Sequence, residues 1–146
     1  MPGKVPTRSP THEEIPIARL PGMGLELEDI ANGDGVVALD ALVELAEDRG
    51  RPASNYLAAI PLASELTLAP LGKPVTVRVC AGTCQRYGAL ELLDYLVGKR
   101  SASIVPVECL DQCDHGPAVE VHGPSGKLLL APASFPKLDE AIAALA

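Results

Sequence analysis

The stretch VTVRVCAGTCQRYGALELLDYLV, residues 75–97, joins the pattern of a β-strand to the pattern of an amphipathic helix. Three valines at its start alternate with polar residues, which is typical of a half-buried strand. Apolar residues at helical spacing follow toward its end. Cys80 and Cys84 lie between these two patterns, so the sequence predicts a strand and a helix joined by a thiol-bearing loop.

A second pair of cysteines follows the next predicted strand, in PVECLDQCDHGPAVEV at residues 106–121. Cys109 and Cys113 repeat the spacing of Cys80 and Cys84, and the four are the only cysteines of the chain. A helical crossover between the two strands predicts that they are parallel, so both loops should emerge at one edge of the sheet. The sequence therefore predicts that the four thiols converge on one inorganic site.

Four thiolates suit either one zinc ion or a 2Fe-2S cluster. Structural zinc sites have metal to sulfur bonds of about 2.3 Å and permit a C-x3-C pair, although C-x2-C is more typical. A 2Fe-2S core is broader and asks each loop to hold one iron, and Gly82 and Gly116 leave room for backbone N–H groups near the sulfurs. Disulfide exchange is the weaker alternative, because a C-x2-C redox motif would not explain the second pair.

Other polar residues near the cysteines are interpreted as structural. Because four cysteines complete a ligand set, we interpret His115 as a solvent-facing loop residue. Asp111 and Asp114 are expected at the exposed rim of the site, and no catalytic residue is predicted. His122 is expected on a strand and His12 near the amino terminus. No glycine-rich phosphate loop follows a strand, so the sequence predicts no FMN or NAD(H) site in this chain.

Composition narrows the class of protein further. The chain has 146 residues, a formal net charge of -7, three Tyr, one Phe and no Trp. Few aromatic residues and a negative charge argue against nucleic-acid binding, which uses base stacking and clustered cations. The sequence shows no signal peptide or bilayer-length apolar run, so we expect a cytoplasmic protein without direct membrane insertion. In a reducing compartment, cysteines are more often metal ligands or redox groups than structural disulfides.

The chain is expected to divide into three parts. Prolines and glycines punctuate residues 1–33, which predicts an extended arm that lies along its own surface or a partner's. Residues 34–72 are predicted to be a short helical region, with one helix over residues 36–49 and a second that ends before Pro61. Residues 73–146 alternate between strand and helix in the order βαβββα, or βαββα if one strand is only a bridge, which predicts a mixed sheet with helices packed on it. Ser134 is predicted to cap the last helix, whose Leu138, Ile142 and Leu145 are expected to face inward.

The segments VRVCAGTC, RYGALELLDYL and ECLDQCDHGPAVEV resemble the thioredoxin-like 2Fe-2S ferredoxins. They are most similar to the small ferredoxin subunit of NADH:quinone oxidoreductase (respiratory complex I), a subunit that also serves NAD-linked hydrogenases and formate dehydrogenases. The likeness covers residues 36–146 and includes Gly88 and Ala89 at the start of a helix. The chain departs from the family by one residue fewer between its first two cysteines, and by Asp111 where glycine is common.

The resemblance implies a thioredoxin-like domain over residues 73–146, with Cys80 and Cys84 on one iron and Cys109 and Cys113 on the other. It also implies a one-electron relay that is a subunit of a flavin-containing, NAD(H)-linked oxidoreductase and is not catalytic alone. FMN and NAD(H) would then be bound by a partner subunit. A stand-alone ferredoxin and a zinc-dependent protein-binding module are the alternatives.

Overall fold

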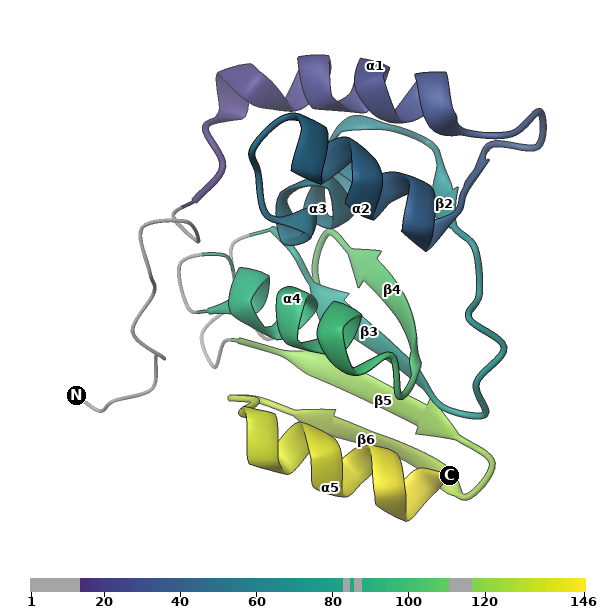
Figure 1. The fold of residues 1–146 in the computed structure, drawn as a ribbon. Coiled ribbons are helices and arrows are strands. Elements are labelled where there is room, and N and C mark those ends of the chain that lie inside the picture. Colours follow the sequence, from purple (N-terminus) through teal and green to yellow (C-terminus); the bar gives the residue numbers. More distant parts are fainter. Residues whose placement is uncertain (1–13, 83–84, 86–87, 111–116) are drawn as a thin grey trace.

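The architecture combines α-helices with β-sheets. The computed structural model describes residues 14–82, 85, 88–110 and 117–146, which form five α-helices and two β-sheets (Figure 1). The smaller sheet has two strands, and the larger has four strands of mixed direction. The predicted α/β class is therefore confirmed.

The larger sheet is built around its central strand β3. The strand order is β4-β3-β5-β6, in which β3 runs parallel to β4 and antiparallel to β5, and β6 is antiparallel to β5. Helix α4, Ala89–Lys99, connects β3 to β4, so the predicted parallel crossover is confirmed. The strands are β3 Thr76–Cys80, β4 Ser103–Val107, β5 Val119–Gly123 and β6 Gly126–Leu130.

The two faces of this sheet differ in what covers them. The valines on either side of Arg78 are fully buried, whereas Arg78 lies on the opposite face because successive strand residues alternate. Helices α4 and α5, Phe135–Leu145, lie side by side over one face (Figure 1). The ring of Tyr95 on α4 stacks on that of Phe135 on α5, with centroids 4.2 Å apart. The helices thus contact each other as well as the sheet.

Helix α5 begins at the predicted cap. Ser134 Oγ accepts a hydrogen bond from the backbone N–H of Lys137 at 3.4 Å, which pairs a donor that the first helical turn would leave unsatisfied. Leu138, Ile142 and Leu145 are buried along one side of the helix, as their spacing predicts. The sequence pattern therefore predicted both the start and the buried face of α5.

A layer of three helices and a small sheet precedes the larger sheet. Helix α3, Ala53–Ala63, is the middle helix and contacts α1, α2, α4 and β4. Residues 54–60 are all buried, as expected for a helix enclosed on several sides. The small sheet pairs β1, Val36–Val37, in parallel with β2, Thr67–Leu68. The other two helices are α1 Leu20–Ile30 and α2 Leu39–Asp48.

The prediction of an extended arm over residues 1–33 is wrong for residues 17–30. A short 3-10 helix, η2 (Ile17–Arg19), leads directly into α1. Pro21 stands in the first turn of α1, where the missing N–H would have no intrahelical partner in any case. Residues 1–13 lie outside the described residues. Pro21, which was expected to interrupt regular structure, therefore lies in the first turn of a helix.

Gly24 lies inside α1 and is needed for the packing of this helix on α3. A Cβ atom on Gly24 would lie 2.4 Å from the carbonyl oxygen of Ala63 at the end of α3. Met23 and Leu27, which flank this contact on the same side of α1, are 2% and 0% exposed. The absence of a side chain at residue 24 lets the two helices approach closely enough to bury both residues.

Helix α3 continues past the proline that was expected to end it. The predicted end lay before Pro61, but α3 runs to Ala63. Pro61 has no N–H to donate to the preceding turn, so the helix lacks one hydrogen bond near its end. The hydroxyl of Ser64 donates a hydrogen bond to the carbonyl of Ile60 at 2.8 Å, which satisfies an acceptor near that end.

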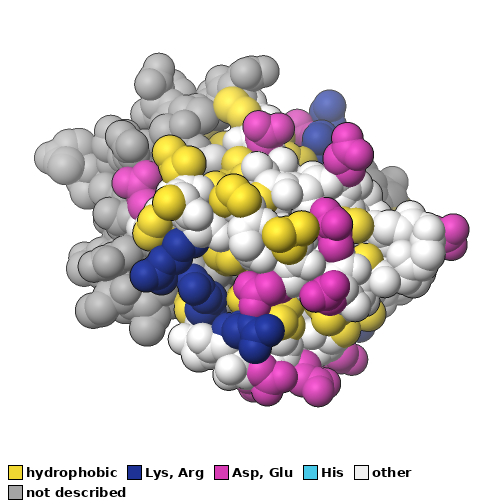
Figure 2. Space-filling view, turned by 90° about the horizontal axis from the view of Figure 1, so that it is seen from above, with side chains coloured by type: hydrophobic (Ala, Val, Ile, Leu, Met, Phe, Trp, Pro, Cys, Tyr) yellow, Lys and Arg dark blue, Asp and Glu magenta, His cyan; other side chains and the backbone are white. Residues whose placement is uncertain are grey.

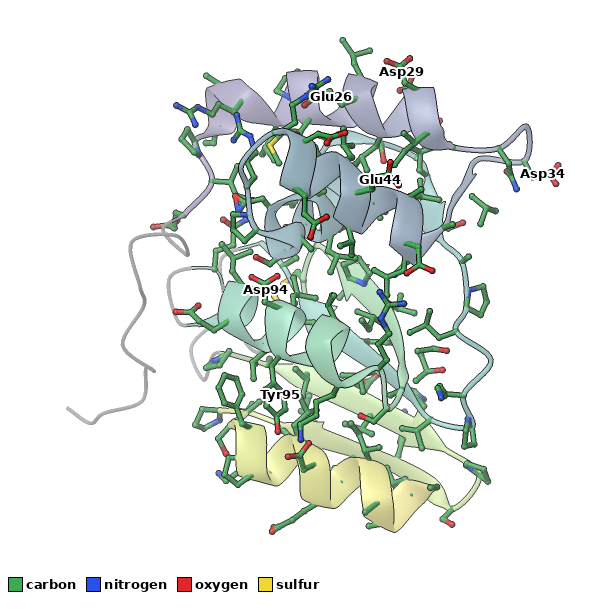
Figure 3. All side chains as sticks on the ribbon, in the orientation of Figure 1. Glu26, Asp29, Asp34, Glu44, Asp94 and Tyr95 are labelled. Atoms are coloured by element: carbon green, nitrogen blue, oxygen red, sulfur yellow. The ribbon has the colours of Figure 1, made fainter. Side chains whose placement is uncertain are left out.

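A polar cluster joins α1, α2 and α3 around Glu26 (Figure 3). The Glu26 carboxylate accepts a 2.8 Å hydrogen bond from the Tyr56 hydroxyl and pairs with the Arg49 guanidinium at the end of α2. The hydrogen bond from Arg49 holds the pKa of Glu26 below its ordinary value, although desolvation acts in the opposite direction. Burial, with the hydrogen bond to Glu26, raises the pKa of Tyr56 to about 12.

The substitution Glu26→Gln is expected to lower the free energy of unfolding at pH 7 by about 1 kcal/mol. A carboxylate with a depressed pKa in the folded state stabilises the fold above its unfolded-state pKa and loses that effect as the pH falls through its folded-state pKa. The difference in the free energy of unfolding between wild type and variant should therefore shrink as the pH falls below about 5, because the ordinary pKa of glutamate is about 4.3. Urea unfolding across this pH range measures it.

The exposed Glu44 on α2 provides the control for this experiment (Figure 3). Glu44→Gln removes the same charge from the same helical layer, and it is expected to change the stability only slightly at every pH. An equal pH-dependent loss in both variants would mean that overall charge, and not the cluster around Glu26, is responsible.

A second polar contact attaches α3 to α4. The carboxylate of Asp94 on α4 accepts hydrogen bonds from the backbone N–H of Ser54 at 2.9 Å and from its hydroxyl at 2.7 Å (Figure 3). Ser54 lies in the first turn of α3, and the residue before this helix, Pro52, makes no capping bond with its side chain. Asp94 therefore caps α3 from the neighbouring helix.

The outer surface of the helical layer is mixed in character. Acidic side chains lie among hydrophobic ones over this face, and Lys and Arg side chains form a row along one side (Figure 2). Ile17 of η2 and Leu25 of α1 are 85% and 64% exposed, unlike the buried residues that face α3. In the part of the chain that the structure describes, no helix is both long and apolar enough to cross a bilayer.

Candidate metal centre

The site predicted from the cysteines begins at the carboxyl end of the central strand. Cys80 is the last residue of β3 and is completely buried. In the parallel register Cys80 stands opposite Val107, the last residue of β4. The N–H of Ala81 donates to the Val107 carbonyl at 2.7 Å, so the pairing extends one residue beyond the strand. The two strands therefore end together at one edge of the sheet.

The segment that carries the second cysteine pair contacts Cys80 directly. The Sγ atom of Cys80 lies 3.7 Å from the carbonyl oxygen of Glu108. That carbonyl belongs to the peptide bond that precedes Cys109, whose side chain is exposed. The structure therefore brings one cysteine of each pair to the same edge of the sheet, in agreement with the expectation from parallel strands.

The second thiol-bearing segment starts and ends on opposite sides of Cys80. It leaves the sheet after Val107 of β4, and the chain returns at Ala118, just before β5. The backbone N–H of Cys80 donates to the Ala118 carbonyl at 3.1 Å. Since β3 lies between β4 and β5, both anchors of the segment that contains Cys109 and Cys113 flank Cys80.

Gly82 permits the close approach of the two thiol-bearing segments. A Cβ atom at residue 82 would lie 2.5 Å from the Glu108 carbonyl oxygen, a distance that real Cβ atoms essentially never show. The atom in the way belongs to the backbone, so a side-chain rotation could not relieve the contact. A glycine is therefore required here for the observed packing between the ends of β3 and β4.

A second glycine shapes the entry into α4. Gly88 precedes Ala89, the first residue of the helix, and has φ of 101° and ψ of 13°. Residues with side chains rarely adopt this left-handed conformation. The carbonyl of Gly88 accepts a 3.2 Å hydrogen bond from the N–H of Leu92, which begins the helical ladder. The chain can thus turn from the thiol loop into α4.

The remaining two predicted ligands, Cys84 and Cys113, lie outside the described residues. The same is true of the neighbouring polar residues His115, Asp111 and Asp114. Within residues 14–82, 85, 88–110 and 117–146, no three His, Cys, Asp or Glu side chains gather as a metal site. The structure thus locates two of the four predicted ligands, and Cys84 and Cys113 stay predictions.

The sulfur chemistry of the donor set fits iron or zinc. Thiolates prefer soft or borderline metal ions, and a four-sulfur set is typical of zinc or iron-sulfur centres. The close packing of backbone around Cys80 leaves the exposed Cys109 on the outer side of the same edge. An inorganic centre held here would therefore be attached to the core by one ligand and accessible from outside at another.

His122 belongs to a different cluster, on strand β5 as the sequence predicts. Its Nε2 lies 2.6 Å from Glu120 Oε1, and the Arg78 guanidinium donates to the same oxygen at 3.0 Å. The hydrogen bond with His122 has the largest effect, and together with that from Arg78 it holds the pKa of Glu120 below its ordinary value. Glu120 stands opposite Arg78 in the register of β3 and β5, so this is a cross-strand contact of the sheet. His12 lies outside the described residues.

Sequence reasoning missed the buried side chain of Gln85. This residue lies between the first thiol loop and α4, and it is 5% exposed. It bonds to Ile15 near the amino terminus and to Ala81 beside Cys80. A polar residue in a glycine-containing loop is ordinarily solvated, and its distance in sequence from Ile15 left no local pattern that could reveal the contact.

No protein-family model matches the chain, and a comparison with curated proteins finds no significant match. The likeness to thioredoxin-like ferredoxins therefore depends on the cysteine spacing and on the order of strands and helices in this chain.

Proposed function

We propose that this chain is a one-electron relay that holds a 2Fe-2S cluster with Cys80, Cys84, Cys109 and Cys113. The single observation that carries the proposal is the position of Cys80 at the end of β3. Its Sγ lies 3.7 Å from the carbonyl before Cys109, and its backbone lies between the two ends of the second cysteine segment. This arrangement favours one shared centre over two independent thiol pairs.

The order of the elements supports a thioredoxin-like domain over residues 73–146. In this region a parallel β-α-β unit, β3-α4-β4, is followed by an antiparallel pair of strands and a final helix. The parallel unit places both thiol-bearing segments at the carboxyl ends of neighbouring strands. The same arrangement would allow the protein to present a redox centre at one edge while the sheet and helices form a fixed support.

The residues of the chain would hold and shield the centre and would not transform a substrate. When bound, a 2Fe-2S cluster supplies a site that accepts and gives up one electron at a time. Cys80, which is completely buried, would hold one side of the cluster against the core. Backbone N–H groups near the sulfurs would tune the reduction potential. Cys109, which is exposed, would mark the side from which an electron partner approaches.

The proposed place of the chain is as a subunit of a flavin-containing, NAD(H)-linked oxidoreductase. NADH delivers two electrons as a hydride, so a flavin must separate them before a one-electron centre can take part. The sequence predicts no nucleotide-binding loop, so FMN and NAD(H) would be bound by a partner subunit. Helix α1 packs on α3 of its own chain, so the subunit role rests on this electron count and not on an extended arm.

Anaerobically purified protein is expected to contain about two irons and two sulfides per chain and to give a rhombic paramagnetic signal after one-electron reduction. Each of the substitutions Cys80→Ser, Cys84→Ser, Cys109→Ser and Cys113→Ser should remove or severely reduce that signal. The variant His115→Ala should keep the wild-type iron content, because four cysteines already complete the ligand set. Metal analysis, sulfide assay and electron paramagnetic resonance measure these outcomes.

The alternatives predict different results in the same preparation. Colourless protein with one zinc per chain would support a structural zinc module that binds partners and would overturn the relay proposal. Iron-loaded protein that purifies with no flavin-containing partner from its native cells would support a stand-alone ferredoxin. Association with a flavoprotein that reduces the cluster on addition of NADH is the expected result for a subunit.

A further inference from the structure

Gln85 connects two parts of the chain that are far apart in sequence. Its Oε1 accepts a 2.9 Å hydrogen bond from the backbone N–H of Ile15, which is 70 residues earlier. Its Nε2 donates a 2.7 Å hydrogen bond to the carbonyl of Ala81, the residue after Cys80. Gln85 and Ile15 are both buried, at 5% and 6% exposure. One amide side chain thus joins the start of the described amino-terminal segment to the first thiol loop.

The contact acts on backbone that is already held from the other side. The N–H of Ala81 donates to Val107 of β4 at 2.7 Å, while its carbonyl accepts the bond from Gln85. The N–H of Gln85 donates in turn to the carbonyl of Gly82 at 3.0 Å. Ala81, directly after Cys80, is therefore held by the neighbouring strand and by the Gln85 side chain, and Gly82 is bonded to the Gln85 backbone.

Both ends of this bridge are costly to leave without a partner. A buried N–H or carbonyl that loses its hydrogen bond keeps the full penalty of its removal from water. Any arrangement in which the Gln85 side chain turns away would leave the Ile15 N–H and the Ala81 carbonyl to find new partners inside the protein. The bridge therefore favours the observed position of the Ala81 backbone, in which Cys80 is buried, over arrangements that would bring Cys80 to the surface.

We propose that Gln85 is a positioning residue of the cysteine site, which fastens the first thiol loop to the amino-terminal segment at Ile15. Gln85 acts through Ala81 on the backbone beside Cys80, and it is not itself a ligand. The functional consequence rests on the proposed cluster, but the positioning is a property of the chain alone. Detachment of the amino-terminal segment from Gln85 would therefore make Cys80 more accessible to reagents.

The test uses full-length protein without metal and the variant Gln85→Met, which keeps a similar side-chain volume and removes both hydrogen bonds. Cys80 should react with an alkylating reagent on the order of ten times faster in the variant, because the loop opens more often when two buried hydrogen bonds are lost. The exposed Cys109 should react at an unchanged rate and serves as the internal reference. Mass spectrometry of labelled peptides separates the two sites.

A second measurement follows the other end of the bridge. Hydrogen exchange of the Ile15 amide should accelerate in Gln85→Met together with the alkylation of Cys80. The control variant Ser54→Ala removes the part-buried hydrogen bond that the Ser54 hydroxyl donates to Asp94, between α3 and α4, and leaves Gln85 intact. It should leave both rates unchanged under native conditions, where global unfolding is rare. Equal acceleration in both variants, or wild-type alkylation of Cys80 in Gln85→Met, would overturn the proposal.

Iron-loaded protein provides a measurement, the g-values of the reduced cluster, that a general loss of stability would not change. The principal g-values of the reduced cluster should shift in Gln85→Met and stay at wild-type positions in Ser54→Ala, because only the first variant alters the loop beside the sulfurs. Unchanged g-values in iron-loaded Gln85→Met would refute the functional consequence. If wild-type protein binds no iron, the proposed relay fails, while the alkylation and exchange experiments still decide whether Gln85 positions the loop.

Discussion

The substitution Gly82→Ala is expected to disrupt the cysteine site more than any other change of a residue that is not itself a predicted ligand. The added methyl group would lie 2.5 Å from the Glu108 carbonyl oxygen, which itself contacts Cys80 Sγ. The hydrogen bond between Ala81 and Val107 holds these two backbone segments together. Relief of the clash requires the strand ends to separate, and overpacking of this kind costs about 1–3 kcal/mol.

Two measurements on Gly82→Ala test this expectation. Urea unfolding of metal-free protein should show the loss of stability, and anaerobic purification should yield protein with much less iron than wild type. Gly98→Ala provides the matched control, because residue 98 lies in α4 with no neighbouring atom within 4 Å of an added Cβ. That variant should be as stable as wild type or gain up to about 1 kcal/mol from the helix propensity of alanine. Wild-type stability and iron content in Gly82→Ala would contradict the close packing of the two loops.

The substitution Leu27→Ala is expected to lower the free energy of unfolding by about 2–5 kcal/mol. Leu27 is completely buried on the side of α1 that faces α3, and Gly24 on the same helix permits that close contact. Loss of the side chain removes apolar contacts and leaves a cavity that the fixed helices cannot easily fill. Urea unfolding measures the change.

Leu25→Ala separates burial from helix propensity in this experiment. Leu25 is the same residue type, two positions earlier on the same helix, and its side chain is 64% exposed. Its replacement should change the stability by less than about 0.5 kcal/mol. Similar losses in both variants would show that α1 is not packed on α3 through the Leu27 side of the helix.

Strand β3 and helix α5 could be predicted from sequence because each has a clear period. The alternating valines of β3 and the helical spacing of Leu138, Ile142 and Leu145 on α5 each indicate one buried face. The cap at Ser134 also depends on nearby residues alone. These signals are local, and the structure confirms the element types.

Helix α1 was missed because the sequence reasoning treated each proline and glycine as a break. Pro21 is harmless in a first turn, and Gly24 is favoured by a contact with Ala63 that no local pattern shows. Leu20, Met23 and Leu27 are spaced as on one face of a helix, and this spacing indicates a helix in spite of the glycines. The helix is stabilised by its contact with α3 more than by its own propensity.

The candidate site was predictable to a different extent. Matched cysteine pairs after two neighbouring strands predicted that Cys80 and the segment of Cys109 would meet, and the parallel register brings them together. The sequence could not show that Cys80 would be completely buried, because burial depends on how β4 and β5 enclose β3. It also could not reveal the bridge through Gln85, which joins segments without a shared local pattern.

The central position of β3 determines the order in which this protein can take shape on the ribosome. Helices α1, α2 and α3 all precede β3 and contact one another, so they can associate as soon as residue 63 has emerged. Both neighbours of β3 come later in the chain, and β5 is complete only at residue 123. During synthesis, Cys80 therefore leaves the ribosome before the strands that enclose it, and the nascent chain exposes this thiol to its surroundings until β5 has also emerged.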